Sequence, residues 1–255
     1  FSPAGRRGNE SAELSGYQYG IGFLHVTLPA GHAVPQRLRH EVEAWFDQFK
    51  ADATMQFGPI ALASSAPPVL GPPLRGDGYI AGDGCCDSTR HVRALLPLNG
   101  GFRLAQRFAI DWEKLGADGR LVKGDRKQVG NYHIYGEPIL AVADGTIVDT
   151  RNDLPDQVPG ALPDGLPISE ADGNFAVLDI GGGAFVLYAH MKPGSVRVKT
   201  GDKVKRGDVI GHVGNTGNSS EPHLHLHVMD GPSPLLADGL PYVFDASTVK
   251  AIDRA

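Results

Sequence analysis

The chain has 255 residues with a formal net charge of −5, and this length allows one large domain or two modest ones, each with its own core. The negative charge argues against nucleic-acid binding, which requires a basic surface. No run of about 18 apolar residues is present, so the sequence predicts no membrane span.

The first 70 residues predict a small α+β accessory region. Residues 17–29 alternate loosely between apolar and polar side chains and end in a turn sequence, which indicates a strand. Pro35 and the apolar spacing after it predict an amphipathic helix. Its apolar stripe consists of Val34, Leu38, Val42, Trp45, Phe46 and Phe49. A Pro-rich stretch at 66–73 then separates this accessory region, residues 1–70, from a second domain, residues 71–255.

The two cysteines are neighbours in the sequence, Cys85 and Cys86. Adjacent thiols cannot connect distant segments, so the pair defines no disulfide framework. The pair is either a vicinal disulfide or two reduced thiols, and the strain of a vicinal bridge favours the thiols. The cysteines therefore indicate no compartment, and a chain that begins Phe1-Ser2-Pro3 fits a processed protein or a trimmed one.

Residues 71–255 predict a mostly β domain. The chain contains 34 glycines and 19 prolines, which favour short strands joined by tight turns. Asn99-Gly100-Gly101 is a strong hairpin signal between two strand-like segments. Residues 113–133 and 151–173 are polar and rich in Gly, Pro and Asp, so we expect long loops inserted between strands there. Further strand-like segments cover residues 138–150, 174–190, 195–214 and 223–230.

Five of the ten histidines lie between residues 190 and 227, and three of them alternate with leucine over residues 223–227. Side chains two apart on a strand point to one face, so the three imidazoles share a face while the leucines pack into a core. Imidazoles in such a row repel one another when protonated, and the row suits a metal site or a catalytic cleft. The alternative is the solvated outer face of an edge strand. A single histidine would favour that alternative, whereas three in strict alternation favour a site.

The motifs around these histidines resemble those of lysostaphin/LytM-type peptidoglycan endopeptidases. Glu221-Pro222-His223-Leu224-His225 resembles the family's Pro-His-Leu-His signature, and Leu187-Tyr188-Ala189-His190 resembles its Tyr-x-His motif. The Gly-rich run 196–217 and the segment 138–148 are similar to the family's strands upstream of that signature. The resemblance runs from about residue 107 to 230 and implies a LytM-type antiparallel, barrel-like β-sheet.

The resemblance also implies roles for single residues. In this family two histidines and an aspartate bind zinc, which makes His225 and Asp111 expected Zn²⁺ ligands. His190 and His223 are the expected catalytic residues. Arg107 stands where the family's His-x-x-x-Asp motif has its first histidine. A guanidinium keeps its proton in proteins and cannot bind a cation, so we expect Arg107 to hold the carboxylate of Asp111 instead.

Two other histidines could supply the missing ligand. A three-residue loop at 99–101 would place His91 on the face of the hairpin that carries Asp111. A two-residue loop would turn His91 to the opposite face. His227 shares a strand face with His225, and a site with no third ligand would bind metal weakly or not at all. We expect His91 to be the ligand and leave the other two possibilities open.

The resemblance implies a zinc-dependent endopeptidase, secreted or in the cell envelope (periplasm) of a bacterium, that hydrolyses peptide bonds in peptidoglycan stems or cross-bridges. Peptidoglycan peptides are the expected partners, and the sequence indicates neither the bond cleaved nor the oligomeric state. Arg107 favours an alternative, a degenerate domain that binds peptidoglycan or regulates another hydrolase. The run 198–210 resembles biotinyl- or lipoyl-type carriers, which need a modified lysine in an exposed tight hairpin. Lys192 stands instead in His-Met-Lys-Pro beside His190, and this context argues against a carrier.

Overall fold

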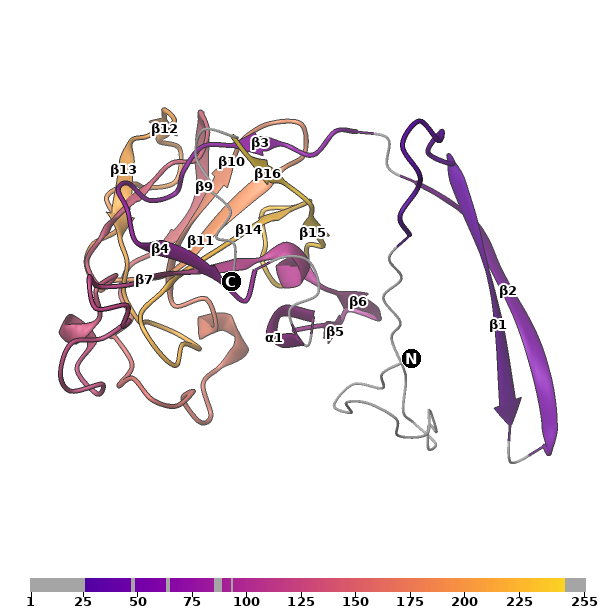
Figure 1. Cartoon of the computed structure of the whole chain (residues 1–255), viewed down its shortest axis with the longest axis horizontal. Helices are drawn as coiled ribbons and strands as arrows, with labels where there is room; N and C mark the ends of the chain where they lie inside the picture. Colours follow the sequence, from indigo (N-terminus) through magenta and orange to yellow (C-terminus); the bar gives the residue numbers. More distant parts are fainter. Residues whose placement is uncertain (1–25, 47–48, 63–64, 85–88, 93, 246–255) are drawn as a thin grey trace. The chain divides into compact units, whose positions relative to one another are not determined.

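The computed structural model describes residues 26–46, 49–62, 65–84, 89–92 and 94–245, and strands predominate among them (Figure 1). The chain divides into two compact units, Phe1–Ala66 and Pro67–Ala255, whereas the prediction placed the division after residue 70. The cysteine pair lies outside the described residues. In the part of the chain that the structure describes, no helix has the length and apolar character needed to cross a membrane.

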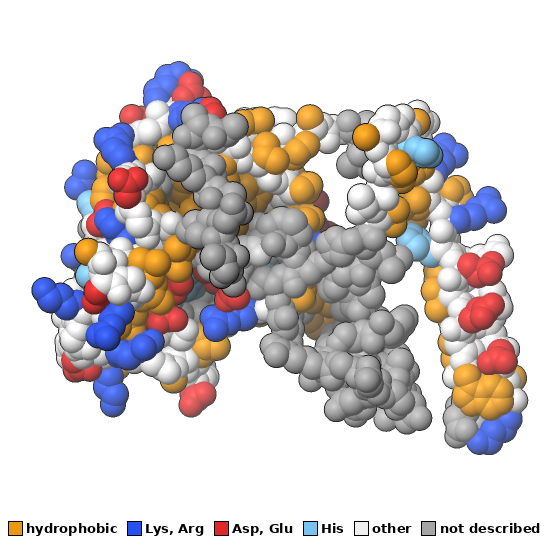
Figure 2. Space-filling model, viewed as in Figure 1, with side chains coloured by type: hydrophobic (Ala, Val, Ile, Leu, Met, Phe, Trp, Pro, Cys, Tyr) orange, Lys and Arg blue, Asp and Glu red, His pale blue; other side chains and the backbone are white. Residues whose placement is uncertain are grey.

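The first unit contains an antiparallel ribbon of two strands, β1 (Arg37–Phe46) and β2 (Ala51–Ala61). The predicted amphipathic helix is therefore wrong. Half-buried side chains alternate along β1 with a period of two, at His40, Val42 and Ala44, and β-branched and aromatic residues favour such a pleated surface. Hydrophobic side chains along the ribbon remain exposed (Figure 2). Of the expected first strand, residues 17–25 lie outside the described residues, and residues 26–29 form no strand.

The second unit is built on an eight-stranded sheet in which every pairing is antiparallel. Its spatial order is β12 (Lys203–Val204), β9 (Gly145–Arg151), β10 (Asn174–Asp179), β11 (Phe185–Met191), β14 (Leu224–Met229), β7 (Ile110–Lys114) and β4 (Tyr79–Gly82). The remaining strand, β15 (Gly239–Leu240), pairs with β14. The predicted mostly β fold with a large antiparallel sheet is confirmed.

Smaller elements surround this sheet. The two-stranded pairs in the described part of the unit are β8 (Pro138–Leu140) with β13 (Val209–His212), β3 (Val69–Leu70) with β16 (Val243–Phe244), and β5 (Leu96–Leu98) with β6 (Gly101–Arg103). The short helical segments are α1 (Thr89–Val92) and the 3-10 turns η1 (Ala105–Phe108), η2 (Val129–Asn131) and η3 (Ile168–Glu170). The segments from β7 to β8 and from β9 to β10 contain one 3-10 turn each and isolated bridges, and they correspond to the two expected loops.

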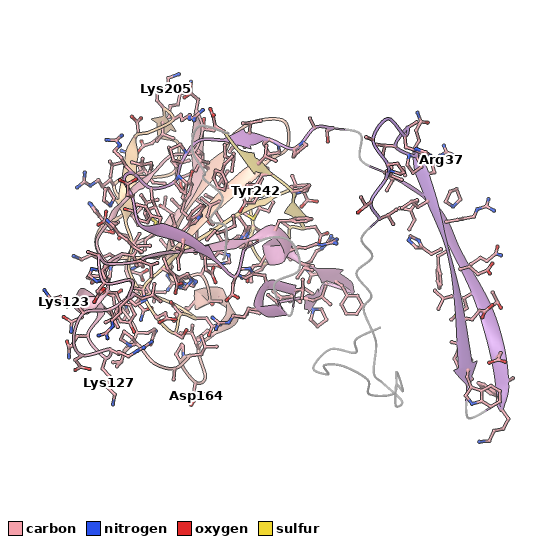
Figure 3. The ribbon with its side chains drawn as sticks, in the orientation of Figure 1. Arg37, Lys123, Lys127, Asp164, Lys205 and Tyr242 are labelled. Carbon is pink, nitrogen blue, oxygen red and sulfur yellow. The ribbon has the colours of Figure 1, made fainter. Side chains whose placement is uncertain are left out.

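The alternation along β14 determines what each face of the sheet carries. Three of its side chains lie in the main core with no exposed surface: Leu224, Leu226 and Val228. Tyr242, labelled in Figure 3, donates a hydrogen bond to the carbonyl of Leu226 at 3.3 Å and holds the chain after β15 to this strand. His225 and His227 alternate with the core residues and point to the other face. The burial of one face of β14 therefore presents its imidazoles on the other.

Candidate functional site

The register between β14 and β7 places His225 directly opposite Asp111. In the same ladder Leu224 pairs with Trp112, and both of these side chains pack into the core. The opposite face therefore receives the imidazole and the carboxylate together. Nδ1 of His225 lies 2.8 Å from Oδ1 of Asp111, and both side chains are largely buried, with 4% and 17% of their surface exposed.

His91 reaches the same carboxylate from α1. Its Nε2 lies 3.3 Å from Oδ2 of Asp111, and its ring centroid lies 5.2 Å from that of His225. The hairpin that was expected to bring it there has a two-residue loop, because Leu98 pairs with Gly101. The three-residue loop is therefore wrong, and the hairpin is too short to determine the position of His91. The helical turn of α1, and not the strand register, places this imidazole beside Asp111.

His190 and His223 lie beside this group. The His190 ring centroid is 4.7 Å from that of His223 and 5.8 Å from that of His225. Nδ1 of His190 lies 2.8 Å from the carbonyl oxygen of Thr216, and Nδ1 of His223 lies 2.7 Å from that of Glu221. A carbonyl only accepts, so each Nδ1 donates its hydrogen. Each imidazole in its neutral form therefore keeps a lone pair on Nε2.

The backbone at His190 adopts a left-handed conformation, with φ of 58°, that residues other than glycine rarely adopt. Two hydrogen bonds hold it. The N–H of His190 donates to the carbonyl of Asp172 at 2.9 Å, and its own carbonyl accepts from the N–H of Gly214 at 3.1 Å. Strained backbone of this kind occurs preferentially at functional sites, where the surrounding structure enforces it.

His227 lies behind His225. Its Nδ1 is 2.9 Å from Nε2 of His225, and the residue has no exposed surface. Among the described residues, two groups of side chains could hold a metal ion: His91, Asp111 and His225, and His190, His223 and His225. His227 belongs to neither group. The structure thus brings five of the six residues considered from the sequence into these two groups. The sixth, His227, contacts the nitrogen of His225 that faces away from Asp111.

The group of His91, Asp111 and His225 has the donor chemistry of a zinc site. Its ligand atoms lie within 4.8 Å of one another, and two imidazole nitrogens with a carboxylate oxygen are a donor set that zinc accepts. Ligands that each lie about 2 Å from zinc are themselves roughly 3–4 Å apart. The contacts of 3.3 Å and 2.8 Å from Asp111 to the two imidazoles are close to that range.

The surroundings of this cluster favour an ionised Asp111 and the neutral forms of His190, His225 and His227. Burial alone would raise the pKa of Asp111, but the charge of His223 and hydrogen bonds from His225 and His91 outweigh burial and hold that pKa well below its ordinary value. Burial lowers the pKa of His190, of His225 and of His227. Neutral imidazoles have the lone pairs that a metal or a proton requires.

Arg107 has a different surrounding from the one expected. The Asp111 carboxylate contacts three histidines, whereas the guanidinium carbon of Arg107 lies 5.1 Å from the ring centroid of Phe108. Imidazoles thus take the place beside Asp111 that was expected for the guanidinium.

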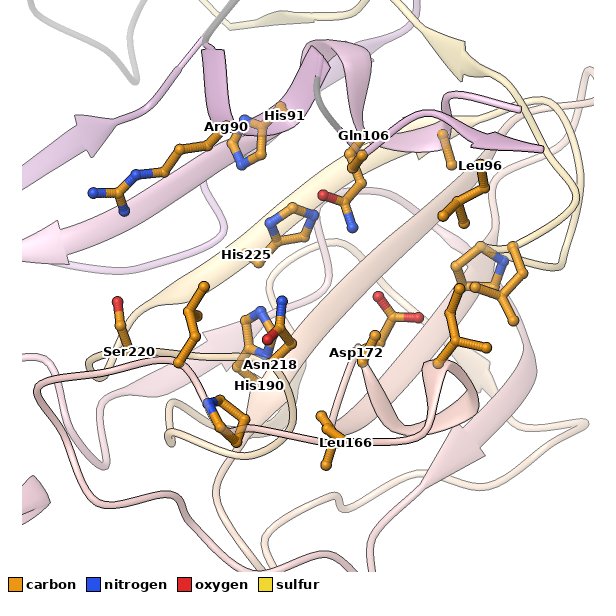
Figure 4. A pocket seen from close by; sticks show the side chains of 18 of the residues that line it. Arg90, His91, Leu96, Gln106, Leu166, Asp172, His190, Asn218, Ser220 and His225 are labelled. Atoms are coloured by element: carbon orange, nitrogen blue, oxygen red, sulfur yellow. The ribbon is translucent and has the colours of Figure 1, made fainter. Parts of the chain in front are cut away.

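A cavity of about 850 Å³ is lined by five of the site residues, His91, Asp111, His190, His223 and His225 (Figure 4). Its opposite wall belongs to the loop between β9 and β10, and this wall is mostly apolar, with Leu162, Leu166 and Ile168. The same loop contributes Asp172, a half-buried carboxylate that sequence reasoning missed. Loop residues follow no periodicity. The available signal was an acidic residue two positions before β10, the strand that pairs with the His190 strand, β11.

Part of the chain is similar to known peptidases. Residues 131–235 match the model of Peptidase family M23, a stretch that includes His190, His223 and His225 but not His91 or Asp111. An uncharacterized metalloprotease of Buchnera aphidicola is 36% identical over 93 residues, 36% of this chain and 20% of that protein. The peptidoglycan DD-endopeptidase ShyA of Vibrio cholerae is 34% identical over 102 residues, 40% of this chain and 20% of that protein.

Further matches extend the comparison. Endolysin 2638A of Staphylococcus phage 2638A is 30% identical over 126 residues, 45% of this chain and 26% of that protein. The chain thus spans about a fifth to a quarter of the length of these curated relatives. The catalytic domain of lysostaphin from Staphylococcus simulans is a similar solved structure, with 25% identity, coverage of 64% of this chain and 86% of that chain, and a TM-score of 0.33.

Proposed function

The chain carries, in residues 131–235, a domain of peptidase family M23, and on this premise we propose that it is a zinc-dependent endopeptidase that hydrolyses peptide bonds in peptidoglycan. One observation carries the proposal. Two imidazole nitrogens and a carboxylate, from His91, Asp111 and His225, converge at the wall of a cavity that His190 and His223 also line. A metal group next to two imidazoles is an arrangement suited to hydrolysis.

We assign the metal to His91, Asp111 and His225, whose facing atoms are Nε2, the carboxylate oxygens and Nδ1. Zinc held by three protein ligands would supply an open position that polarises the scissile carbonyl and lowers the pKa of a water molecule towards about 7. Nε2 of His225 faces Nδ1 of His227, so His227 would orient the imidazole whose other nitrogen would hold the metal.

His190 and His223 move the proton in this proposal. Each donates Nδ1–H to a backbone carbonyl, which fixes the ring and directs the basic Nε2 towards the cavity. One of the two takes a proton from the attacking water as the water oxygen bonds to the scissile carbonyl carbon. It then returns that proton to the nitrogen of the leaving amine, and the C–N bond breaks. The other imidazole hydrogen-bonds to the oxyanion that develops on the carbonyl oxygen.

The names of the relatives and the shape of the site support one substrate class. One relative is named as a peptidoglycan DD-endopeptidase and another as an endolysin. A cavity of about 850 Å³ with an apolar loop on one side accommodates a stretch of extended peptide. We therefore propose peptidoglycan peptides as the substrate and the bacterial cell envelope or its exterior as the place of action.

Arg107 favours a second candidate function, a domain that binds peptidoglycan or regulates another hydrolase without cleaving. The family's motif has a histidine at this position, and a guanidinium cannot replace it as a ligand. The position of His91 beside Asp111 supports the hydrolase instead, because it offers a nitrogen from another segment.

One experiment separates the two functions. The protein is purified without chelator, its zinc content is measured, and it is incubated with peptidoglycan while new amino termini are counted. We expect about one zinc per chain and new amino termini that disappear with chelator and return with zinc. His190→Ala serves as the control, which should keep its zinc and produce no new amino termini. Binding to peptidoglycan without new amino termini in the zinc-loaded protein would favour the second candidate.

A further inference from the structure

Asp172 stands at the end of the loop between β9 and β10, and its position is fixed from two sides. Its carbonyl accepts the N–H of His190 at 2.9 Å, which ties it to the strand carrying that imidazole. The next residue, Gly173, has φ of 66°, and a Cβ there would clash with the carbonyl oxygen of Thr216. A glycine is therefore required at this turn. The backbone of Asp172 is held next to the histidine cluster.

The carboxylate of Asp172 faces the cavity and has no charged partner among the described residues. Figure 4 shows it directed from the loop towards the wall that carries Gln106 and His225. Burial raises its pKa to about 6 and is the one cause of that shift, since neither a nearby charge nor a hydrogen bond contributes. Asp111, in contrast, contacts three imidazoles. A partly desolvated carboxylate without a partner is costly to the protein, and a ligand could supply what it lacks.

Aliphatic side chains line the same cavity as Asp172. Leu162 and Ile168 of the same loop have 56% and 49% of their surface exposed. Both of them, together with Leu235 from another segment, line the cavity. In the described part of the chain, two acidic side chains line this cavity, Asp111 and Asp172. The wall thus combines one carboxylate with an aliphatic surface. A primary ammonium on an aliphatic chain has the complementary chemistry, because its methylenes pack on apolar surface while its head meets the carboxylate.

We propose that Asp172 determines substrate specificity by binding a primary ammonium group that the substrate carries close to the scissile bond. The inference rests on the proposed function and narrows its substrate class to peptides with an unmodified amine. Such an amine comes either from the side chain of a diamino acid or from the free end of a peptide. The backbone bond from Asp172 to His190 sets the distance between the ammonium and the bond that is cleaved.

The test uses synthetic cross-linked stem peptides in which lysine is the diamino acid. One peptide has both its side-chain amine and its terminal amine free, a second is acetylated on the side-chain amine, and a third on the terminal amine. For Asp172→Asn we expect kcat/KM on the free peptide to fall at least about tenfold, as loss of a charge-assisted hydrogen bond does. On the peptide whose acetylation removes the recognised amine, wild type and variant should be equally slow. The acetylated position that matters identifies the source of the ammonium.

The control variant is Asp164→Asn. Asp164 belongs to the same loop and is exposed (Figure 3), and it does not line the cavity, so its substitution should leave all three rates unchanged. A second readout is peptide affinity in the His190→Ala background, measured by calorimetry without turnover. There, Asp172→Asn should weaken binding of the free peptide by at least about tenfold and leave binding of the matching acetylated peptide unchanged.

Each other outcome has a defined meaning. Equal losses of Asp172→Asn on all three peptides would show a structural role and overturn the inference. Wild-type protein that cleaves the free and acetylated peptides at the same rate would also overturn it, while the proposed hydrolase would stand. Zinc-loaded wild-type protein that neither binds nor cleaves any peptide would overturn the proposed function, and this inference with it.

Discussion

The contacts of His91 and His227 separate two kinds of effect on zinc binding. Nε2 of His91 lies 3.3 Å from Asp111, whereas His227 contacts the nitrogen of His225 that faces away from that carboxylate. His91→Ala should therefore lower zinc affinity by more than the 10–100-fold that loss of an orienting partner costs, and His227→Ala by about that amount. Competition titrations with a zinc chelator measure both. His212→Ala, whose ring lies outside this cavity, is the control, and unchanged affinity in His91→Ala would show that the third ligand lies elsewhere.

His225 and His190 should differ in the same way between metal binding and turnover. His225 contacts Asp111, so His225→Ala should abolish zinc binding. His190 donates Nδ1–H to Thr216 and takes part in proton transfer, so His190→Ala should keep its zinc and lose hydrolysis. Metal analysis and a cleavage assay on the same samples test the division. Equal loss of zinc in both variants would contradict it.

Asp172 should make stability depend on pH. Its pKa rises from about 3.9 in the unfolded chain to about 6 in the folded protein. Between these values the folded state binds more protons, so its stability falls as pH rises from 4 to 6 and stays lower above 6. The side chain of Asp172→Asn cannot ionise. The free energy of unfolding of this variant should therefore exceed that of the wild type by about 1–2 kcal/mol at pH 8 and equal it near pH 4. Urea unfolding of the metal-free protein measures the difference, with Asp164→Asn as the control. A variant no more stable than the wild type at pH 8 would contradict this.

The site residues differ in how far the sequence could predict them. Strand alternation predicts that His223 and His225 share a face, because a pleated strand has one geometry, whereas Asp111 was expected from the family resemblance alone. His91 could not be placed by that reasoning, because a four-residue helix and not the hairpin positions it. Asp172 lies in a loop whose path depends on contacts such as that between Gly173 and Thr216, which no local pattern encodes.

Among the elements, β14 connects the core to the histidine cluster. Leu226 has no exposed surface and lies on this strand between His225 and His227. Leu226→Ala should lower the free energy of unfolding by about 2–5 kcal/mol, because it removes buried methyl groups and leaves a cavity. Denaturant unfolding measures the loss. Leu162→Ala, at a side chain that is 56% exposed, should change it by less than about 1 kcal/mol, and equal effects of the two would contradict the role of this core.

The ribbon of β1 and β2 shows why the spacing of apolar residues led to the wrong prediction of a helix. Leu38, Val42, Trp45 and Phe49 are spaced like a helical stripe, but Val42 and Ala44 also fit a period of two. Short apolar patterns often satisfy both periods, and the choice depends on a partner strand. Val42 pairs with Met55 and Ala44 with Ala53, contacts that local spacing does not contain. The main sheet was more predictable, since its strands are short and bounded by glycine-rich turns.

For the molecule as a whole, every residue assigned to the site lies in the unit Pro67–Ala255. A chain that begins at Pro67 should therefore bind zinc as the full chain does. A chain that begins at Gly71 loses β3, whose Leu70 is fully buried and pairs with Phe244, and it should be less stable by about 2–5 kcal/mol. Zinc titration and denaturant unfolding of the two truncated chains measure this. Equal stability of both would place the boundary after residue 70.

The small size of α1 has a consequence for how long a metal ion stays bound. The helix has four residues, and through His91 it contacts Asp111 and the ring of His225. With His91 as a ligand, docking of α1 and occupancy of the metal site stabilise each other by the same amount, because linkage is reciprocal. We expect local opening of α1 to remove the nitrogen of His91 from the site, so the free energy of that opening should affect the residence time of the ion. With His91 as a ligand, the stability of a helical turn would therefore influence the pace of metal exchange.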